Sequence, residues 1–124
     1  MLFWEIKVYF YLGRKEYNKV SEVLDNYLKK RGETFKYCEC CLNYYYEINN
    51  INQSFIYLQK CIHMKKISSK VESWAINTFV RDNILKKKYQ EAARYAMGLA
   101  NLQNLSNKNR VLLLQMLEYI KTKL

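Results

Sequence analysis

The sequence predicts an all-α protein built from pairs of helices, and three observations lead to this prediction. One sequence motif recurs: it begins at Tyr17, Ile51 and Tyr89, and small or apolar residues follow three, seven and ten positions later. This spacing places them on one face of a helix. The 124 residues include no proline and three glycines, so little interrupts the helices. Turn-forming residues separate the apolar segments at regular places.

The spacing between copies of this motif predicts three helical hairpins and a closing helix. The expected repeats are residues 1–34, 35–68 and 73–106, followed by a capping helix at 109–124, which makes seven helices in one domain, 1–124. Turns inside the hairpins are expected at Gly13–Lys15, Asn49–Asn50 and Lys86–Lys88. The hairpins are expected to be separated at Arg31–Glu33 and Ser68–Ser69, with a four-residue insertion around Lys66 to Ser73. A period of this length predicts a solenoid, because one hairpin cannot bury its apolar face alone. The pattern also suits a segment of a longer solenoid.

The apolar positions resemble those of the tetratricopeptide repeat family. Its pattern is an early Trp, a Tyr seven residues later, then a small residue, an aromatic residue and a closing Pro. The residues that fit are Trp4, Tyr11, Tyr17, Val20, Leu24 and Tyr27, then Tyr45, Ser54, Leu58 and Cys61, then Phe79, Tyr89, Ala92, Ala96 and Leu99. The chain departs from the family at the closing Pro, where it has Gly32, Lys66 and Asn104. The resemblance covers about residues 1–106 and implies a right-handed solenoid.

The resemblance also implies a binding surface. In that family the first helix of each hairpin lines a concave groove, which receives an extended peptide or a partner helix. The residues at the corresponding places are Glu5, Tyr9, Leu12, Glu39, Asn43, Tyr46, Asn77, Arg81 and Ile84. The two Asn side chains both donate and accept, as a peptide backbone requires, and Arg81 suits a carboxylate. The alternative is that these are ordinary helix-surface residues, as solvated charge explains Glu5, Glu39 and Glu47.

The charge balance is strongly basic, with 21 Lys and Arg residues against 11 acids and a formal net charge of +10. A basic rim is expected at the helix ends and turns, formed by Lys65, Lys66, Lys70, Lys86, Lys87 and Lys88. This balance favours an acidic protein or peptide as partner, with nucleic acid second. The alternative is that these residues only solvate loops and complement helix dipoles. Most of the 12 tyrosines fall at packing spacings, which weakens the case for RNA.

Four cysteines raise the question of a metal site or a disulfide. Cys38 and Cys61 stand at packing positions of the repeat, where cysteine acts as a small apolar residue. A zinc site would also need Cys40, Cys41 and His63 to converge. On a helix, Cys40 points about 100° from Cys41, and Cys61 about 200° from His63. Core cysteines are therefore expected, with no metal and no cofactor, while a reactive or disulfide role remains the alternative.

The chain carries none of the common catalytic signatures: no glycine-rich phosphate loop, no nucleophile elbow and no paired metal-binding histidines. We therefore expect a non-enzymatic scaffold or adaptor subunit of a protein complex. The alternatives are a peptide-sensing module of a regulator and an RNA-binding helical-repeat protein.

Two apolar edges predict further association. The closing helix carries the stripe Leu113, Leu117, Ile120 and Leu124, and Leu114 widens it, whereas the outer side of a terminal repeat is normally polar. We expect another copy or another chain to cover this helix or the opening edge Leu2–Trp4. No run of 18 apolar residues occurs, and Glu5 and Lys7 interrupt any secretory segment. An intracellular, cytoplasmic protein without a transmembrane segment is expected.

Overall fold

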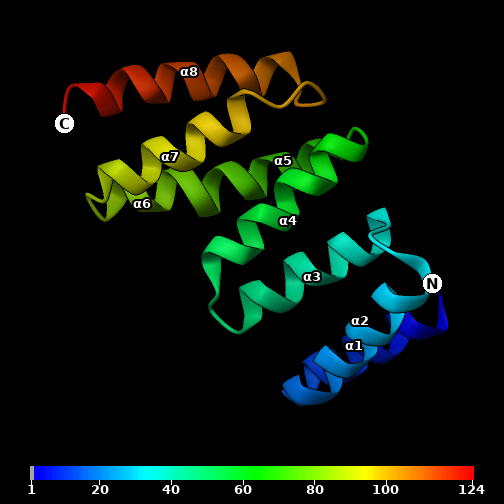
Figure 1. Cartoon of the computed structure of the whole chain (residues 1–124). Coiled ribbons are helices and arrows are strands. Elements are labelled where there is room, and N and C mark those ends of the chain that lie inside the picture. Colours follow the sequence, from blue (N-terminus) through cyan, green and yellow to red (C-terminus); the bar gives the residue numbers. More distant parts are fainter. Residues whose placement is uncertain (1) are drawn as a thin grey trace. The chain divides into compact units, whose positions relative to one another are not determined.

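The computed structural model describes residues 2–124, and all regular secondary structure in that range is helical. The helices are α1 (Phe3–Gly13), α2 (Tyr17–Arg31), α3 (Phe35–Glu47), α4 (Ile51–Met64), α5 (Ser69–Ala75), η1 (Ile76–Arg81), α6 (Asp82–Leu85), α7 (Tyr89–Ala100) and α8 (Asn107–Lys121) (Figure 1). Because α5, η1 and α6 form one continuous helix, the described chain has the seven helices expected from the sequence. None of the helices in residues 2–124 is long and apolar enough to cross a membrane.

The helices gather in two compact units. Unit 1 ends at Cys61, and unit 2 runs from Ile62 to Leu124. In unit 1, α1 packs against α2, and both contact α3. In unit 2, α7 contacts η1 and α6 as well as α8, so it lies between the helix 69–85 and α8 (Figure 1). Each unit therefore has its own helix packing.

The three turns inside the hairpins share one backbone geometry. Their central residues Lys15, Asn49 and Lys87 have φ of 59°, 62° and 60°, in the left-handed region. The residue after each donates its N–H to a carbonyl five residues earlier: Glu16 to Tyr11 at 2.9 Å, Asn50 to Tyr45 at 2.8 Å and Lys88 to Asn83 at 2.8 Å. The same turn thus recurs in each hairpin and lies where the sequence predicted it.

The helices that begin the later hairpins, and α8, share one kind of N-cap. The hydroxyls of Thr34, Ser68 and Ser106 accept hydrogen bonds from the N–H groups of Tyr37, Val71 and Asn109 at 3.2, 3.2 and 3.4 Å. Such caps satisfy N–H groups that have no partner within the helix. The three caps follow one another along the chain at the same spacings as the three turns. Because Ser106 caps it, α8 begins at Asn107 rather than at the predicted residue 109.

The caps and turns locate the four-residue insertion. The segment from the Ser68 cap to the Lys87 turn is four residues longer than the segment from the Thr34 cap to the Asn49 turn, and this difference equals the insertion. The four extra residues therefore lie between Ser68 and Lys87, a range that overlaps the predicted segment around Lys66 to Ser73. Four residues are close to one helical turn, which takes about 3.6. The wider π turn of η1 lies in the same range.

The repeated positions form the core, as predicted. Most motif residues on the inner face of the second helices are buried: Val20, Leu24, Ser54, Leu58, Cys61, Ala92, Ala96 and Leu99, with Tyr27 partly exposed. The first helices contribute Val8, Leu42 and Ile76, which are also buried. In unit 2, Trp74 contacts Phe79 edge to face, with ring centroids 5.8 Å apart.

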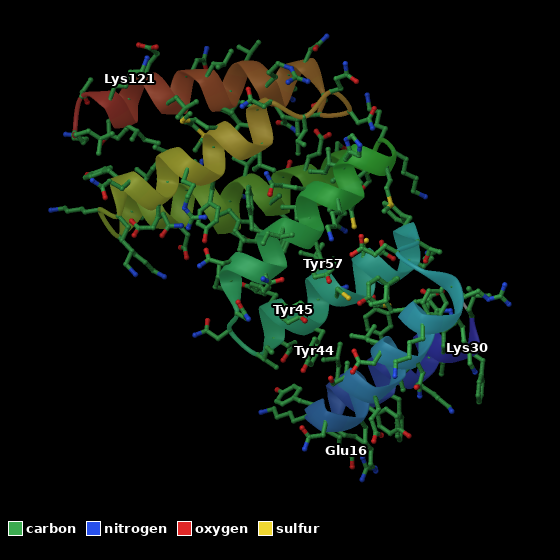
Figure 2. The ribbon with its side chains drawn as sticks, in the orientation of Figure 1. Glu16, Lys30, Tyr44, Tyr45, Tyr57 and Lys121 are labelled. Atoms are coloured by element: carbon green, nitrogen blue, oxygen red, sulfur yellow. The ribbon has the colours of Figure 1, made fainter. Side chains whose placement is uncertain are left out.

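Unit 1 also contains a continuous series of aromatic rings, which we call the aromatic ladder. It runs through Trp4, Tyr27, Tyr37, Tyr57, Tyr45 and Tyr44, with successive ring centroids 4.0 to 6.1 Å apart. Figure 2 shows Tyr44, Tyr45 and Tyr57, its last three members, along α3 and α4. Offset and edge-to-face pairs at such distances stabilise packing beyond their buried area. Many of the tyrosines in unit 1 are therefore structural.

Candidate functional site

In unit 1 the structure brings two of the predicted groove residues together. The Asn43 Nδ2 group donates a hydrogen bond to the Tyr9 hydroxyl oxygen at 3.0 Å, and the Cys40 thiol lies 3.9 Å from the same oxygen. Burial raises the pKa of Tyr9, so its hydroxyl stays neutral. Tyr46 is exposed. A partner that bonded the Asn43 amide would therefore meet a side chain already engaged with Tyr9.

The acidic side chains of this surface differ from expectation. Glu5 is only 3% exposed, and its carboxylate accepts the Leu2 N–H at 3.3 Å at the start of α1, so its description as a solvated surface charge is wrong. A carboxylate there satisfies a free N–H group and complements the helix dipole. Leu12 is buried, and the half-exposed Glu39 lies 3.6 Å from Lys36. Glu5 and Leu12 thus offer little surface to a partner.

In unit 2 the other predicted groove residues lie on the helix 69–85. The Arg81 Nη1 group donates to the Asn77 Oδ1 atom at 2.6 Å, and both side chains are exposed. Ile84 is half-buried. Both residues belong to η1, and their exposure makes them accessible to a partner. An incoming carboxylate would compete with the Asn77 amide for the guanidinium.

The six residues of the basic rim are all exposed. Lys86 pairs with Asp82 at 3.2 Å, a surface pair that contributes little stability. Unit 2 carries 12 of the 21 Lys and Arg residues but only four of the 11 acids. Positive charge is therefore concentrated in unit 2.

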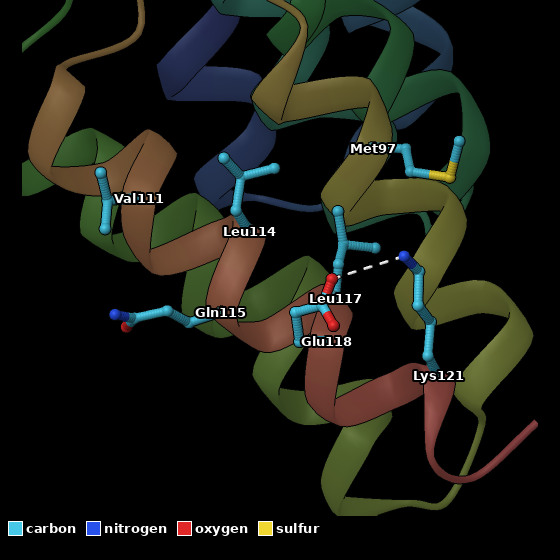
Figure 3. A pocket seen from close by; sticks show the side chains of 7 residues that line it. All are labelled: Met97, Val111, Leu114, Gln115, Leu117, Glu118 and Lys121. Atoms are coloured by element: carbon cyan, nitrogen blue, oxygen red, sulfur yellow. Dashed lines mark hydrogen bonds and ion pairs between the residues drawn. The ribbon is translucent and has the colours of Figure 1, made fainter.

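A pocket of about 530 Å³ lies between α7 and α8. Its lining residues are Met97, Val111, Leu114, Gln115, Leu117, Glu118 and Lys121. Figure 3 shows Met97 on α7 and the other six on α8. Met97, Val111 and Leu114 are 54%, 54% and 51% exposed, while the Lys121 Nζ atom lies 3.4 Å from the Glu118 carboxylate at the rim. This α7–α8 pocket is an apolar surface with a polar border.

The repeat shows what is unusual about this pocket. Leu42, Ile76 and Leu114 each stand eight residues after an N-cap, at Thr34, Ser68 and Ser106. Leu42 and Ile76 are 6% and 2% exposed, against 51% for Leu114. In the earlier hairpins a second helix follows: Ser54 of α4 donates its hydroxyl to the Leu42 carbonyl at 3.0 Å, and α7 packs against η1. No further helix follows α8 in residues 2–124.

Sequence reasoning found only part of this site. It identified α8 as unusually apolar, including Leu114 and Leu117, but it also counted Leu113 and Ile120, which are buried. It did not find Met97, because that residue is not at one of the inward-facing positions of the repeated motif. The distance from the N-cap gives Leu114 the same position as the buried Leu42 and Ile76, so the sequence alone does not indicate that Leu114 is exposed.

A buried carboxylate was also missed. Glu72 is 1% exposed, and its Oε1 atom accepts hydrogen bonds from the Ser106 hydroxyl and the Asn109 side chain, both at 2.7 Å. Its Oε2 atom accepts the Ser106 N–H at 3.2 Å. Arg110 donates to the Leu102 and Leu105 carbonyls at 2.7 and 3.2 Å. These bonds fix the start of α8, and hence one wall of the pocket.

The four cysteines are buried and free, so the core placement predicted for them is confirmed. Burial raises the pKa of Cys40, Cys41 and Cys61 to about 12 and also raises that of Cys38. His63 is exposed. Within residues 2–124, no group of three or more His, Cys, Asp and Glu side chains is arranged to hold a metal ion.

The chain was also compared with known proteins. No protein-family model, no curated protein and no solved structure matches it. The candidate site therefore rests on the geometry of the chain itself, and the α7–α8 pocket is its best-defined part.

Proposed function

We propose that the protein is a non-enzymatic interaction module, a scaffold or adaptor subunit that binds a segment of another protein. The observation that carries this proposal is the α7–α8 pocket, in which three large apolar side chains are each more than half exposed. Exposed apolar patches with a polar border mark interaction sites. The excess of basic residues in unit 2 favours an acidic partner.

The repeated turns and N-caps support the helical-hairpin part of the proposal. All three hairpins bend at the same turn, and the second and third begin with the same cap, as expected for a stack of similar tetratricopeptide-like units. We propose that the hairpins form a right-handed solenoid. Two surfaces are then candidates for peptide binding: that of Tyr9 and Asn43 in unit 1 and that of Asn77 and Arg81 in unit 2.

Site-specific crosslinking in cells tests this function. A photo-crosslinking amino acid replaces Leu114 in the pocket, and the control carries it in place of Leu85, which is 79% exposed on α6 and does not line the pocket. We expect a discrete protein to be crosslinked from position 114 and not from position 85. If neither position yields a crosslinked protein, or both yield the same set, the pocket is not the interaction site.

The basic excess of unit 2 favours RNA binding as a second candidate function. Its test is the salt dependence of binding to a single-stranded RNA, because log affinity falls linearly with log salt when phosphate contacts dominate. Reversing Lys86, Lys87 and Lys88 to Glu should lower that slope while leaving helicity intact. Absence of RNA binding at low salt removes this candidate.

A further inference from the structure

The α7–α8 pocket occupies the place that a second helix fills in the other hairpins. Leu114 corresponds by its distance from the N-cap to Leu42 and Ile76, beside which α4 and α7 pack. Those two side chains are almost fully buried, whereas Leu114 is half exposed. By analogy with α4 and α7, an occupant of this place is best matched by a helix.

We propose, resting on the interaction function above, that the α7–α8 pocket takes an amphipathic helix of an acidic partner protein, which lies beside α8 as the second helix of a hairpin. The pocket lining runs along α8 from Val111 to Lys121. At 1.5 Å per residue this is about 15 Å, or roughly three turns of an occupying helix.

The second helices of this chain show which side chains such a partner needs. Their inner faces carry small or apolar residues with the spacing i, i+4, i+7: Val20, Leu24 and Tyr27, then Ser54, Leu58 and Cys61, then Ala92, Ala96 and Leu99. The first residue of each set is fully buried. A small side chain there lets the helix backbones approach closely. The partner helix should repeat this spacing, with a small residue leading.

The charge of unit 2 indicates which charged residues the polar side of the partner helix should carry. The pocket lies in a unit with twelve basic and four acidic residues, and one acid at its rim, Glu118, is already paired with Lys121. Arg94 is exposed on α7, one turn before Met97. Glu or Asp on the flanks of the partner helix therefore complements this surface. A second copy of the same chain would place two strongly basic units against each other, so we do not assign the pocket to a dimer.

Two labelled synthetic peptides, each long enough for roughly four helical turns, test the proposal against the full chain. Both carry the spacing of Ala92, Ala96 and Leu99; one has Glu at its outer positions and the other has Lys. A scrambled acidic peptide of the same composition, without the spacing, is the specificity control. Binding is measured by fluorescence anisotropy, and peptide helicity by circular dichroism. We expect the acidic peptide to bind and to gain helicity, and to bind more weakly as salt rises.

Two matched variants locate the binding. Leu114→Gln should weaken binding of the acidic peptide tenfold or more, which corresponds to about 1.4 kcal/mol, because the peptide then packs against a polar side chain. Leu85→Gln changes another exposed leucine of the same unit, outside the pocket, and it should leave binding unchanged.

Several results would overturn the proposal. Equal binding of the spaced and scrambled peptides, equal binding to Leu114→Gln, or no binding at all each excludes a helix in this place. Sedimentation that shows a dimer of the native chain, lost in Leu114→Gln, assigns the pocket to a second copy instead. If crosslinking from position 114 captures a protein while neither spaced peptide binds, the interaction function stands and only the helix inference fails.

Discussion

The Asn109 side chain donates a hydrogen bond to the buried Glu72 carboxylate, with 2.7 Å between Nδ2 and Oε1. Together with the two bonds from Ser106, this joins the start of the helix 69–85 to the start of α8. A carboxylate at a helix N-terminus interacts favourably with the helix dipole and with its free N–H groups. One acidic side chain therefore helps to hold α8, and with it one wall of the pocket.

Replacing Glu72 should therefore destabilise unit 2. Glu72→Ala leaves the Ser106 and Asn109 donors without an acceptor, and we expect a loss of roughly 2–4 kcal/mol in the free energy of unfolding. Glu72→Gln keeps one acceptor oxygen and should lose less. Urea unfolding followed by circular dichroism measures both. Glu91→Ala, an exposed acid of the same unit, is the control and should change stability by less than about 0.5 kcal/mol. An equal effect of Glu72→Ala and the control would show that the network contributes nothing.

The left-handed turn residues predict opposite effects of glycine at adjacent positions. Lys87 has φ of 60°, which costs a residue with a Cβ atom about 1–2 kcal/mol, more than the roughly 0.5–1 kcal/mol of chain entropy that glycine adds. Lys87→Gly should therefore stabilise the protein by about 0.5–1 kcal/mol. At Lys88 φ is −91°, so Lys88→Gly should destabilise it by a similar amount. Thermal unfolding of the two variants compares them, and equal shifts would contradict the turn geometry.

The buried thiols should resist modification in the folded state. The thiolate is the reactive form, and a pKa of about 12 leaves about one thiol in ten thousand ionised at pH 8 for Cys40, Cys41 and Cys61. We expect slow labelling by a thiol reagent in native buffer and fast labelling in denaturant. A Lys108→Cys variant, exposed on α8, provides the fast native control. Labelling of the buried cysteines as fast as that control would contradict their burial.

The same pKa shifts predict how stability changes at alkaline pH. Because the folded pKa of these thiols lies above the unfolded value of about 8.5–9, their contribution is fully present below pH 9 and is lost as pH rises toward 12. Each thiol contributes a slope of up to about 1.4 kcal/mol per pH unit in that window. Urea unfolding at pH 9 to 11 measures the slope. Cys41→Ala should make it shallower, and an unchanged slope would show that this thiol does not titrate there.

The predicted groove can be tested with its two amides. Asn43→Ala combined with Asn77→Ala should weaken partner binding by about 10- to 100-fold, since each amide hydrogen bond contributes about 0.5–1.5 kcal/mol. Asn43→Ala should also cost stability of that same order, because it removes the bond to Tyr9, whereas Asn77→Ala should not. Titration calorimetry with a partner protein recovered from cells by the native chain measures binding, and Glu22→Ala on α2 is the control. Normal binding of the double variant, with loss in Glu22→Ala, would place the site elsewhere.

The hairpin pattern was predictable because it depends on local spacing. Small or apolar residues at three, seven and ten positions after Tyr17, Ile51 and Tyr89 define a helix face, and residues such as Asn49 define where that face ends. The place of the insertion could be predicted only coarsely, because the repeated motif marks only second helices. The hydroxyl of Ser68, which holds the place that Thr34 has in the preceding hairpin, carries the missing information.

The carboxylates and the pocket were harder to predict for a different reason. Glu5 and Glu72 look like surface charges in the sequence, and their burial depends on a nearby backbone N–H group in one case and on Ser106 and Asn109 in the other. The last of these bonds joins residues 37 positions apart, beyond any local pattern. Leu114 is likewise exposed because little packs against it, and an apolar stripe in the sequence does not indicate whether another element covers it.

Trp4, at the end of the aromatic ladder, and Trp74, against Phe79, are the two tryptophans of the chain, and they fall in different units. Each unit thus contains its own intrinsic fluorophore. With Trp4→Phe, emission follows only the residues around Trp74, and with Trp74→Phe it follows only those around Trp4. A denaturation experiment on the two single-tryptophan proteins would show whether both halves of the chain melt at one denaturant concentration or at two.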